Sequence, residues 1–346
     1  MSQRENVNPR REQDHRKNSR RYQKRAAARR RRNTIFIMEI VLLLILAVVL
    51  FFVSKLSKIE KTKLDMDKIE VNEDISQESR KIMKGYQTIA MFGLDNRSNG
   101  NLSQGRSDVI MLANINNDTK EVKLVSVYRD TYLDTGDGIF QKCNAAYAKG
   151  GPEQAISMLN VNLDLNITDY VTVDFNSIIE CVDLLGGVDM EITDDEASLM
   201  TGYIRELNEL TGNKAENLTQ GGTYTLNGVQ ACAYARIRYG GGDDYRRTER
   251  QRTVLTAMVK KAQQSDLTTV NKLINEVCGD IQTSFSNAEL LALASQVFQY
   301  SIGDTTGFPF TKTTRVLSKK TGDVVIPCDL SDNVKELHIF LYEDSA

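Results

Sequence analysis

The chain has 346 residues, of which 26% are charged, and a formal net charge of −2. This length allows one large domain or two ordinary ones. His15 and His338 are the only histidines and no Cys-x-x-Cys pair occurs, so beyond the N-terminal segment a histidine triad or zinc site is excluded unless His338 takes part.

Residues 1–33 form a strongly basic segment. They hold eleven Arg and two Lys against three acids, so the rest of the chain carries a net charge of about −12. A basic segment can bind nucleic acid, but one beside an apolar segment needs no such partner. We therefore expect a cytoplasmic tail and no nucleic acid.

Residues 34–54 predict one transmembrane helix. Ile40–Val53 is an unbroken run of fourteen apolar residues, and Glu39 is the only charge between Asn33 and Lys55. About 20 residues cross a bilayer, and this segment just reaches that length. A cleaved signal peptide is the alternative, but no good cleavage site follows the run. The positive-inside rule then places the tail in the cytoplasm and the C-terminal part outside, in a single-pass protein of the cell membrane.

Residues 55–85, rich in Lys, Glu, Asp and Ser, predict a partly helical stalk. From Tyr86 onward, short apolar runs alternate with amphipathic segments, which is typical of an α/β fold. With no internal repeat or flexible linker, 86–346 is expected to form one extracytoplasmic domain. Cys278 and Cys328 flank turn-like sequence, and a disulfide between them stays open.

The elements of this domain follow from apolar periodicity and capping signals. The predicted strands are 88–94, 109–113, 122–127, 169–175 and 188–192, with an edge hairpin from 314–317 and 323–326. The predicted helices are 152–159, 177–185, 196–210, a short one beginning within 226–230, and 248–261, 267–277 and 288–300.

Charged residues stand where the first three strands begin or end. Asp95 follows the first strand, Asp108 precedes the second, and Arg129 follows the third. Loops at strand ends line the ligand crevice of open α/β sheets, so these side chains are expected to converge. Carboxylates without a neighbouring histidine suit a hard cation such as Mg²⁺. The alternative is that both aspartates bond their own turns.

The segment 234–252 is the most unusual stretch. It holds six Arg and no Lys, three consecutive glycines at 240–242, and the pair Asp243 and Asp244. Guanidinium groups bind phosphate oxygens two at a time, and the following helix would offer its N-terminus to an anion. The alternative is a solvated helix start with i,i+4 charge pairs.

Eight motifs run through the domain in a recognisable order. They are Gly93–Arg97, Arg106–Asp108, Ser126–Tyr132, Lys142–Tyr147 with Gly150–Gly151, Val173–Phe175, Val182–Val188, Leu226–Gly228 and Tyr234–Gln251. Together they resemble the LytR-CpsA-Psr family of bacterial envelope proteins. Tyr128 stands where that family usually has Pro, and Cys143 where it has a branched aliphatic residue. Arg246 replaces a small residue, which leaves open whether Arg246 or Arg247 contacts phosphate.

The resemblance implies an α-β-α sandwich with a mixed central sheet. It also implies a phosphotransferase that moves a glycopolymer, such as teichoic acid or capsule, from a polyprenyl pyrophosphate lipid to peptidoglycan during cell wall assembly. Two other functions stay open. One is an envelope-related transcriptional attenuator, and the other is a polyprenyl pyrophosphate hydrolase or a lipid carrier without catalysis.

The resemblance also assigns roles to individual residues. Asp95 and Asp108 match the ligands of Mg²⁺, with Mn²⁺ as an alternative metal. One of Asp243 and Asp244 matches the base that deprotonates the attacking hydroxyl. The pyrophosphate-binding groups match Arg106, Arg129, Lys142, Arg236, Arg238, Arg247 and Gln251.

A polyprenyl tail would need a dry cavity between the sheet and the helices. We expect this cavity to be built from residues such as Val173, Phe175, Ile178, Leu184 and Leu185. For each residue taken singly, ordinary core packing explains the pattern equally well.

Overall fold

The computed structural model describes residues 60–61, 64–94, 102, 105–238, 244–266, 269, 272–273, 281–319 and 321–343. The predicted tail, membrane helix and first part of the stalk lie outside these ranges, as do most of the predicted helix 267–277 and both Asp95 and Asp243. Among the helices within these ranges, none has the length and apolar character of a membrane span.

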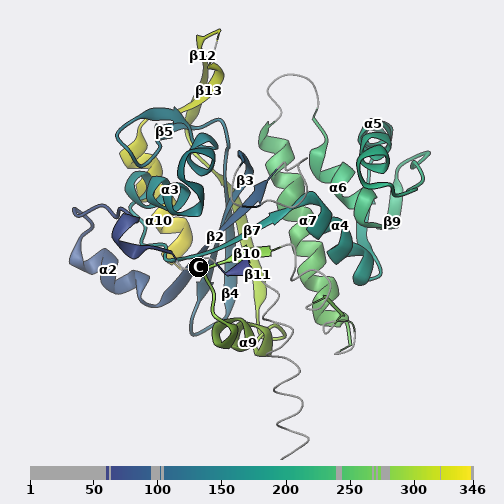
Figure 1. Ribbon diagram of the computed structural model, residues 1–346, viewed down its shortest axis with the longest axis horizontal. Coiled ribbons are helices and arrows are strands. Elements are labelled where there is room, and N and C mark those ends of the chain that lie inside the picture. Colours follow the sequence, from purple (N-terminus) through teal and green to yellow (C-terminus); the bar gives the residue numbers. More distant parts are fainter. Residues whose placement is uncertain are drawn as a thin grey trace, which may run out of the picture. The chain divides into compact units, whose positions relative to one another are not determined.

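A seven-stranded mixed sheet runs through the described part of the chain (Figure 1). Its parallel pairs are β2 with β7, β4 with β11 and β1 with β10, and its other pairs are antiparallel. The strand order is β1 (Glu60–Lys61), β10 (Ile281–Thr283), β7 (Asp169–Asp174), β2 (Tyr86–Leu94), β3 (Ser107–Asn116), β4 (Glu121–Val127) and β11 (Ser301–Phe308). The mixed sheet expected from the sequence is confirmed.

One face of this sheet is covered by α3 (Ala145–Leu163) and α10 (Leu330–Tyr342) (Figure 1). Alternate residues of β2, such as Ala90 and Phe92, point into this layer because successive side chains of a strand face opposite ways. Helix α3 is kinked at Gly150 and Gly151, the second of which has a φ of 65° that favours glycine. The predicted helix 152–159 is therefore the second half of α3.

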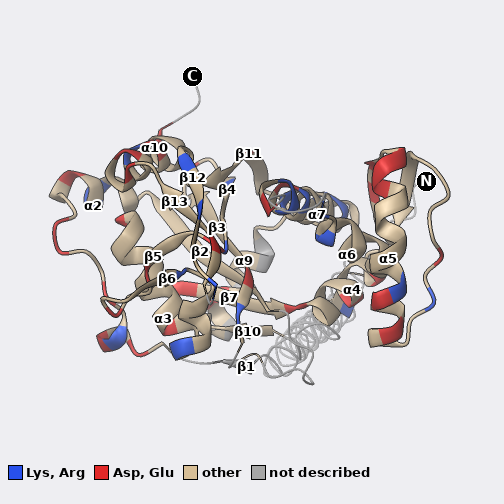
Figure 2. Ribbon diagram, turned by 90° about the horizontal axis from the view of Figure 1, so that it is seen from above, with Lys and Arg blue, Asp and Glu red and all other residues tan. Residues whose placement is uncertain are grey.

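Several helices lie on the other side of the sheet, and an antiparallel hairpin packs with them (Figures 1 and 2). They are α4 (Phe175–Leu184), α5 (Asp194–Thr211), α6 (Gly228–Arg236), α7 (Asp244–Gln264) and α9 (Asn287–Ser295), and the hairpin is β8 (Val188–Ile192) with β9 (Gly222–Leu226). Capping boxes at Thr193 and Asn227 begin α5 and α6. Helices thus flank the sheet on both faces, as expected for this α/β fold.

The structure corrects several expected boundaries and adds elements. Helix α9 ends at Ser295 instead of 300, because residues 296–299 turn into β11. The predicted edge hairpin is confirmed as β12 (Lys312–Ser318) with β13 (Gly322–Pro327). Elements not predicted are β1, β9, β10, β11, α10 and the hairpin of β5 (Tyr132–Asp134) with β6 (Phe140–Lys142). The stalk region contains η1 (Met66–Lys68) and α2 (Gln77–Met83).

The cysteines in the described ranges are all free thiols. Cys328 is exposed and unbonded, which contradicts a bridge to Cys278, a residue outside the described ranges. Cys143 and Cys232 are buried, and burial raises the pKa of the Cys232 thiol to about 12. These two side chains act as small apolar groups of the interior.

Candidate active site

An apolar cavity of about 400 Å³ lies between the second face of the sheet and helices α4, α6 and α7. Strands β2, β3 and β7 form its floor, and Asp108 at the start of β3 lies at its polar part. Four cationic or amide side chains join the lining there, namely Arg236, Arg238, Arg247 and Gln251. The cavity therefore combines apolar walls with a positively charged region.

Arg129 is the centre of a polar network beside this cavity. Its guanidinium lies 2.9 Å from Oδ2 of Asp108, 3.5 Å from Oδ2 of Asp130 and 3.6 Å from Oδ2 of Asp244. These partners come from β3, from the loop after β4 and from the first turn of α7. The expected convergence of charges at the strand ends is thus found for Asp108, Arg129 and Asp130.

The loop that carries Arg129 is held by backbone contacts. The carbonyl oxygen of Arg129 accepts a hydrogen bond from the backbone N–H of Asn144. The Sγ of Cys143 lies 3.2 Å from the carbonyl oxygens of Tyr128 and Arg129. Tyr128 packs edge-on against Tyr245 with ring centroids 4.6 Å apart. Tyrosine in place of the family's usual proline therefore leaves Arg129 directed at the site.

Asp244 joins the arginines of α6 and α7 to this network. Its Oδ1 lies 3.1 Å from Nη1 of Arg247 and 3.7 Å from Nη2 of Arg238. Arg247 also donates to the backbone carbonyl of Asp108 at 3.4 Å. Of the two aspartates between which the sequence left the base undecided, Asp244 is part of the network, and Asp243 lies outside the described residues.

Asp130 links Lys142 to the same carboxyl. Lys142 on β6 lies 2.7 Å from Oδ1 of Asp130, and the carboxyl groups of Asp130 and Asp244 share a hydrogen bond. Burial and this hydrogen bond raise the pKa of Asp244, although Arg129 and Arg238 oppose the rise. The pKa of Asp130 is lowered overall. Burial by itself would raise this pKa, but hydrogen bonds to Asp244 and Lys142 and the charge of Arg129 outweigh that effect. Asp244 is therefore the member of the pair that holds a proton more readily.

Arg129 remains charged in this setting. Burial would lower the pKa of its guanidinium, but the charges of Asp108, Asp244 and Asp130 together raise it. The guanidinium of Arg129 is thus permanently charged and partly buried. Because a guanidinium can bind two oxygens of one anion, this residue suits an anion-binding site.

The phase of α7 decides which arginines face the cavity (Figure 2 shows its basic residues). Arg247 and Gln251 are one turn apart and line the cavity, whereas Arg246 is exposed. Arg250 is buried elsewhere and pairs with Glu196 at 3.1 Å. The structure thus favours Arg247 over Arg246 at the site.

Arg236, the last residue of α6, is held by three groups within the cavity wall. It lies 3.2 Å from Glu206, and its guanidinium carbon is 5.1 Å from the ring of Phe175 and 5.8 Å from that of Tyr203. Phosphate binding by Arg236 would compete with Glu206. Arg238 is 40% exposed and is the easier of the two to redirect toward a ligand.

Several polar atoms at the site are buried without a hydrogen-bond partner among the described residues. They are Nε of Arg129, Nε of Arg247, Oε1 of Gln251 and Oδ1 of Asp244. Buried polar groups are nearly always paired in folded proteins, so a cluster of unpaired ones at a cavity indicates a site for a polar ligand.

The residues of the apolar walls can be compared with those expected to line the tail cavity. Val173, Phe175 and Ile178 line it as expected, but Leu184 and Leu185 do not. Leu185 is instead 6% exposed in the core between α4, α5 and α6, because it lies on another face of the helix end. Lining residues that the sequence did not indicate include Met91, Met111, Tyr203, Leu255 and Met258.

The remaining predicted residues are placed differently. Arg106 is exposed just before β3 and is absent from the cavity lining given by the described residues. No cluster of three or more acidic, histidine or cysteine side chains suited to a metal occurs within the described ranges. Asp95 lies outside them, but Leu94 and Ser107, the neighbours of Asp95 and Asp108, are paired across β2 and β3. Of the two predicted metal ligands, Asp108 is therefore the one that the described residues include.

Sequence reasoning did not assign a role to Asp130 or Glu206. Asp130 adjoins Arg129 at a strand end, and that position was a usable signal. Glu206 is one of several acids on an amphipathic helix, so its pairing with Arg236 across 30 residues of sequence was not recognisable.

Comparisons with known proteins agree with this fold. Residues 46–315 match the model of the LytR_cpsA_psr family. A teichoic acid transferase TagU of Enterococcus faecalis is 30% identical over 60% of this chain and 64% of its own length. The Biofilm regulatory protein A of Streptococcus mutans is 31% identical over 57% of this chain and 49% of its own length. The chain thus spans between about half and just under two thirds of these relatives.

Solved structures show the same architecture. TagT bound to LIIa-WTA superposes with a TM-score of 0.60 at 20% identity, covering 81% of this chain and 97% of that one. TagT with bound octaprenyl pyrophosphate lipid gives a TM-score of 0.57 at 21% identity, covering 81% and 99%. At these identities the likeness concerns the fold alone. The family match over 46–315 nevertheless establishes identity at the family level: the chain belongs to the LytR-CpsA-Psr family.

Proposed function

We propose that this protein is a membrane-anchored phosphotransferase that moves a glycopolymer from a polyprenyl pyrophosphate lipid to peptidoglycan in cell wall assembly. The observation that carries the proposal is one cavity with apolar walls and a rim of Arg236, Arg238 and Arg247. A polyprenyl tail needs the first feature, and a pyrophosphate needs the second. Relatives named as teichoic acid transferases, and a same-fold structure with bound octaprenyl pyrophosphate, support the assignment.

The arginines would bind the two phosphates. Arg247 is buried and fixed by Asp244, whereas Arg238 is exposed enough to turn toward a ligand. Together with Arg129 they would neutralise the charge that develops on the leaving phosphate as the bridging bond breaks. Arg236, Lys142, Arg106 and Gln251 are proposed as supporting groups of the same pyrophosphate site.

Asp244 is proposed as the general base. It must take the proton of the attacking sugar hydroxyl, and its raised pKa makes it a better proton acceptor than an ordinary aspartate. Asp130 is hydrogen-bonded to Asp244, and its negative charge is balanced by the ion pair with Lys142. Asp243 remains an alternative base.

A divalent cation is part of the proposal. Asp108 and Asp95 would hold Mg²⁺, or Mn²⁺, whose positive charge would stabilise phosphate oxygens during transfer. The pairing of Leu94 with Ser107 supports this, since it joins the chain positions next to both aspartates. Chelation by EDTA is expected to suppress transfer, and re-addition of Mg²⁺ to restore it. Undiminished transfer in excess chelator would remove the metal from the proposal.

The proposal includes a membrane topology for the chain. Residues 1–33 would form the cytoplasmic tail, 34–54 the transmembrane helix and 55–85 the stalk, with the catalytic α-β-α domain at 86–346 outside the cell. A fourteen-residue apolar run beside a basic segment supports this arrangement. Protease treatment of intact and permeabilised cells, with tags at both ends, would test it.

The function is tested by incubating the purified full chain with a polyprenyl pyrophosphate glycan and lipid-free peptidoglycan oligomers. A transferase yields a covalent conjugate of glycan and peptidoglycan. Release of free glycan instead would indicate a hydrolase, and an unchanged substrate after demonstrated binding would indicate a lipid carrier.

A regulatory role is favoured by one finding, namely that a relative is named a biofilm regulatory protein. Such a role would require the basic tail to bind a cytoplasmic partner. Deletion of residues 2–30 with the membrane segment kept separates the two functions, because a transferase keeps its activity and a regulator of this kind loses its effect.

A further inference from the structure

The hairpin of β5 and β6 exposes apolar side chains next to the candidate active site. Ile139 is 51% exposed and Phe140 is 53% exposed. The buried side of the hairpin is anchored by Leu133, which is 1% exposed in the core against α3. One face of the hairpin is thus fixed to the domain, and the other presents apolar groups to solvent.

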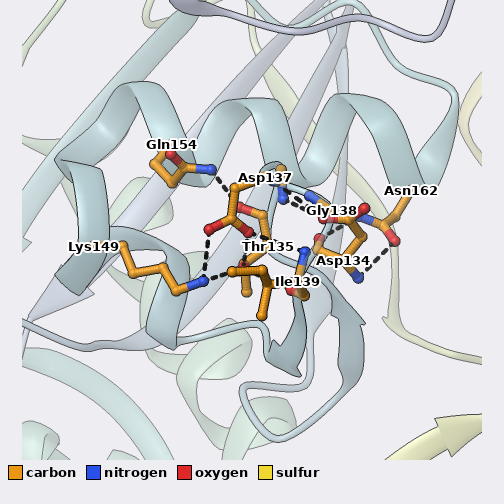
Figure 3. Close-up of polar contacts among 9 residues, drawn as sticks. Asp134, Thr135, Asp137, Gly138, Ile139, Lys149, Gln154 and Asn162 are labelled. Atoms are coloured by element: carbon orange, nitrogen blue, oxygen red, sulfur yellow. Dashed lines mark hydrogen bonds and ion pairs between the residues drawn. The ribbon is translucent and has the colours of Figure 1, made fainter.

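A polar network keeps the turn of this hairpin in one conformation (Figure 3). The Asp134 carboxylate accepts hydrogen bonds from the backbone N–H groups of Gly136 and Gly138, both at 2.9 Å. Gly136 and Gly138 have φ of 78° and 73°, a conformation that glycine adopts readily. The hydrogen bonds to Asp134 and the two glycines therefore stabilise this conformation of the turn.

Helix α3 ties the same turn to the domain. Lys149 lies 2.8 Å from Asp137, Gln154 donates to the carbonyl of Thr135 at 2.6 Å, and Asn162 donates to that of Asp134 at 2.7 Å (Figure 3). A turn tied at so many points presents its exposed side chains with little loss of freedom on binding. Ile139 and Phe140 thus offer a preformed apolar surface to a ligand.

The strand register places the exposed Phe140 and the partly buried Tyr132 on the same face as Lys142. Tyr132 pairs with Lys142 and Asp134 with Phe140, so these side chains share the outer face. The rings of Tyr132 and Phe140 are 6.0 Å apart and tilted by 40°. Lys142 contacts Asp130, which is bonded to the proposed base. Phe140 lies two residues before Lys142 on β6, a backbone separation of about 7 Å.

The hairpin packs through Leu133 on the α3 face of the sheet, whereas the tail cavity lies on the α7 face. Arg236, Arg238 and Arg247 line that cavity, whereas Lys142, Tyr132 and Phe140 do not. Phosphoryl transfer places the attacking and leaving oxygens in line on opposite sides of the phosphorus. With the lipid phosphate as leaving group on the cavity side, the attacking hydroxyl arrives from the hairpin side.

We propose that Tyr132 and Phe140 form a stacking platform for the sugar rings of the peptidoglycan acceptor. The proposal rests on the proposed function and names the acceptor-binding surface of the same site. The C–H face of a pyranose ring packs on an aromatic face through apolar contact and weak C–H interactions. The sugar that carries the attacking hydroxyl would lie at the base, and a neighbouring sugar of the same glycan chain would stack on Phe140.

The absence of tryptophan from the sequence allows a direct test. Phe140→Trp in the full chain introduces a single tryptophan, whose fluorescence is followed while lipid-free peptidoglycan glycan oligomers are added. Phe298→Trp is the matched control, since Phe298 is 55% exposed but precedes β11, whose first residue pairs with the start of β4 at the far end of the sheet. Saturable change is expected for Phe140→Trp alone.

A second variant measures the contribution to transfer. Phe140→Ala is expected to raise KM for the peptidoglycan acceptor about tenfold, with kcat and affinity for the lipid donor nearly unchanged. Phe140→Tyr should restore most of the acceptor affinity. An equal loss for donor and acceptor would assign the surface to the donor glycan and overturn the proposal.

The two proposals fail in distinguishable ways. Saturable binding at Phe140→Trp without any conjugate in the transfer assay would keep the platform and refute the transferase. Conjugate formation, with no fluorescence change and an unaltered KM for Phe140→Ala, would keep the transferase and refute the platform.

Discussion

The two faces of β7 differ in a way that separates the core of this protein from its cavity. Thr172, a polar residue, is fully buried and contacts the Tyr147 hydroxyl on the side of α3. Val171 and Val173, which are apolar, are only partly buried and line the cavity on the side of α7. On this part of the strand the polar residue is therefore buried more deeply than its apolar neighbours.

The two sides of the sheet also differ in how completely side chains fill the space beside it. On the α3 side, Ala90, Phe92 and Leu112 are at most 1% exposed, so side chains fill the space between sheet and helices. On the α7 side the same sheet leaves about 400 Å³ open. An unfilled apolar cavity costs stability, and its retention beside a cluster of arginines indicates a ligand that fills it.

The largest effect is expected from removing a charge on the cavity side. Arg247→Ala should reduce transfer about 100- to 1,000-fold, since a buried guanidinium that is proposed to bind the phosphates is lost. Arg246→Ala, one residue earlier but exposed, should stay within about twofold of wild type. Rates measured with the lipid donor and peptidoglycan oligomers check both. Equal losses in the two variants would break the assignment of the helix face.

Filling the cavity should separate ligand binding from stability. In Val173→Phe the added ring occupies open space, so the free energy of unfolding should be retained while affinity for the lipid falls about 10- to 100-fold. Lipid binding and thermal unfolding are measured on the same sample. A stability loss with unchanged lipid affinity would show that this wall is ordinary core.

Truncation on the two faces should give unequal costs in stability. Leu112→Ala, on the filled side, is expected to lower the free energy of unfolding by about 2–5 kcal/mol. Val173→Ala, on the cavity side, should cost about 1 kcal/mol. Denaturant unfolding of both variants tests the contrast, and matching losses would contradict it.

The smallest effect concerns the pH dependence. A base acts when deprotonated, so with Asp244 as the proposed base its raised pKa should place the acidic limb of kcat/KM above the pH expected for an ordinary aspartate. Asp130→Asn removes a hydrogen bond and a negative charge that raise this pKa, while burial remains. The limb should therefore move to lower pH. Asp189→Asn, on an exposed residue of β8, should leave the profile in place.

Much of the fold could be predicted from the sequence. β2, β3 and β4 have long apolar runs, and those runs identified them correctly. β11 was missed because Gly303 and several exposed residues interrupt its pattern, and the pairing register shifts between Ile302 and Thr305. β5 and β6 have three residues each, too few for a period to be recognised.

The candidate site was predictable in its residue types and only partly in its geometry. The convergence of Arg129 and Asp108 followed from their places at strand ends. The choice of Arg247 over Arg246 depends on the phase of α7, which adjacent arginines do not reveal. Leu185 and Val173 look alike in sequence, yet one packs in the core and the other lines the cavity, because that outcome depends on long-range packing.

The central claim is tested most directly by a crystal structure of the protein with a bound polyprenyl pyrophosphate. We expect the tail in the cavity against Val173 and Met258, with phosphate oxygens within hydrogen-bonding distance of Arg238 and Arg247. Density for the tail outside the cavity, or for the pyrophosphate away from these arginines, would contradict the account.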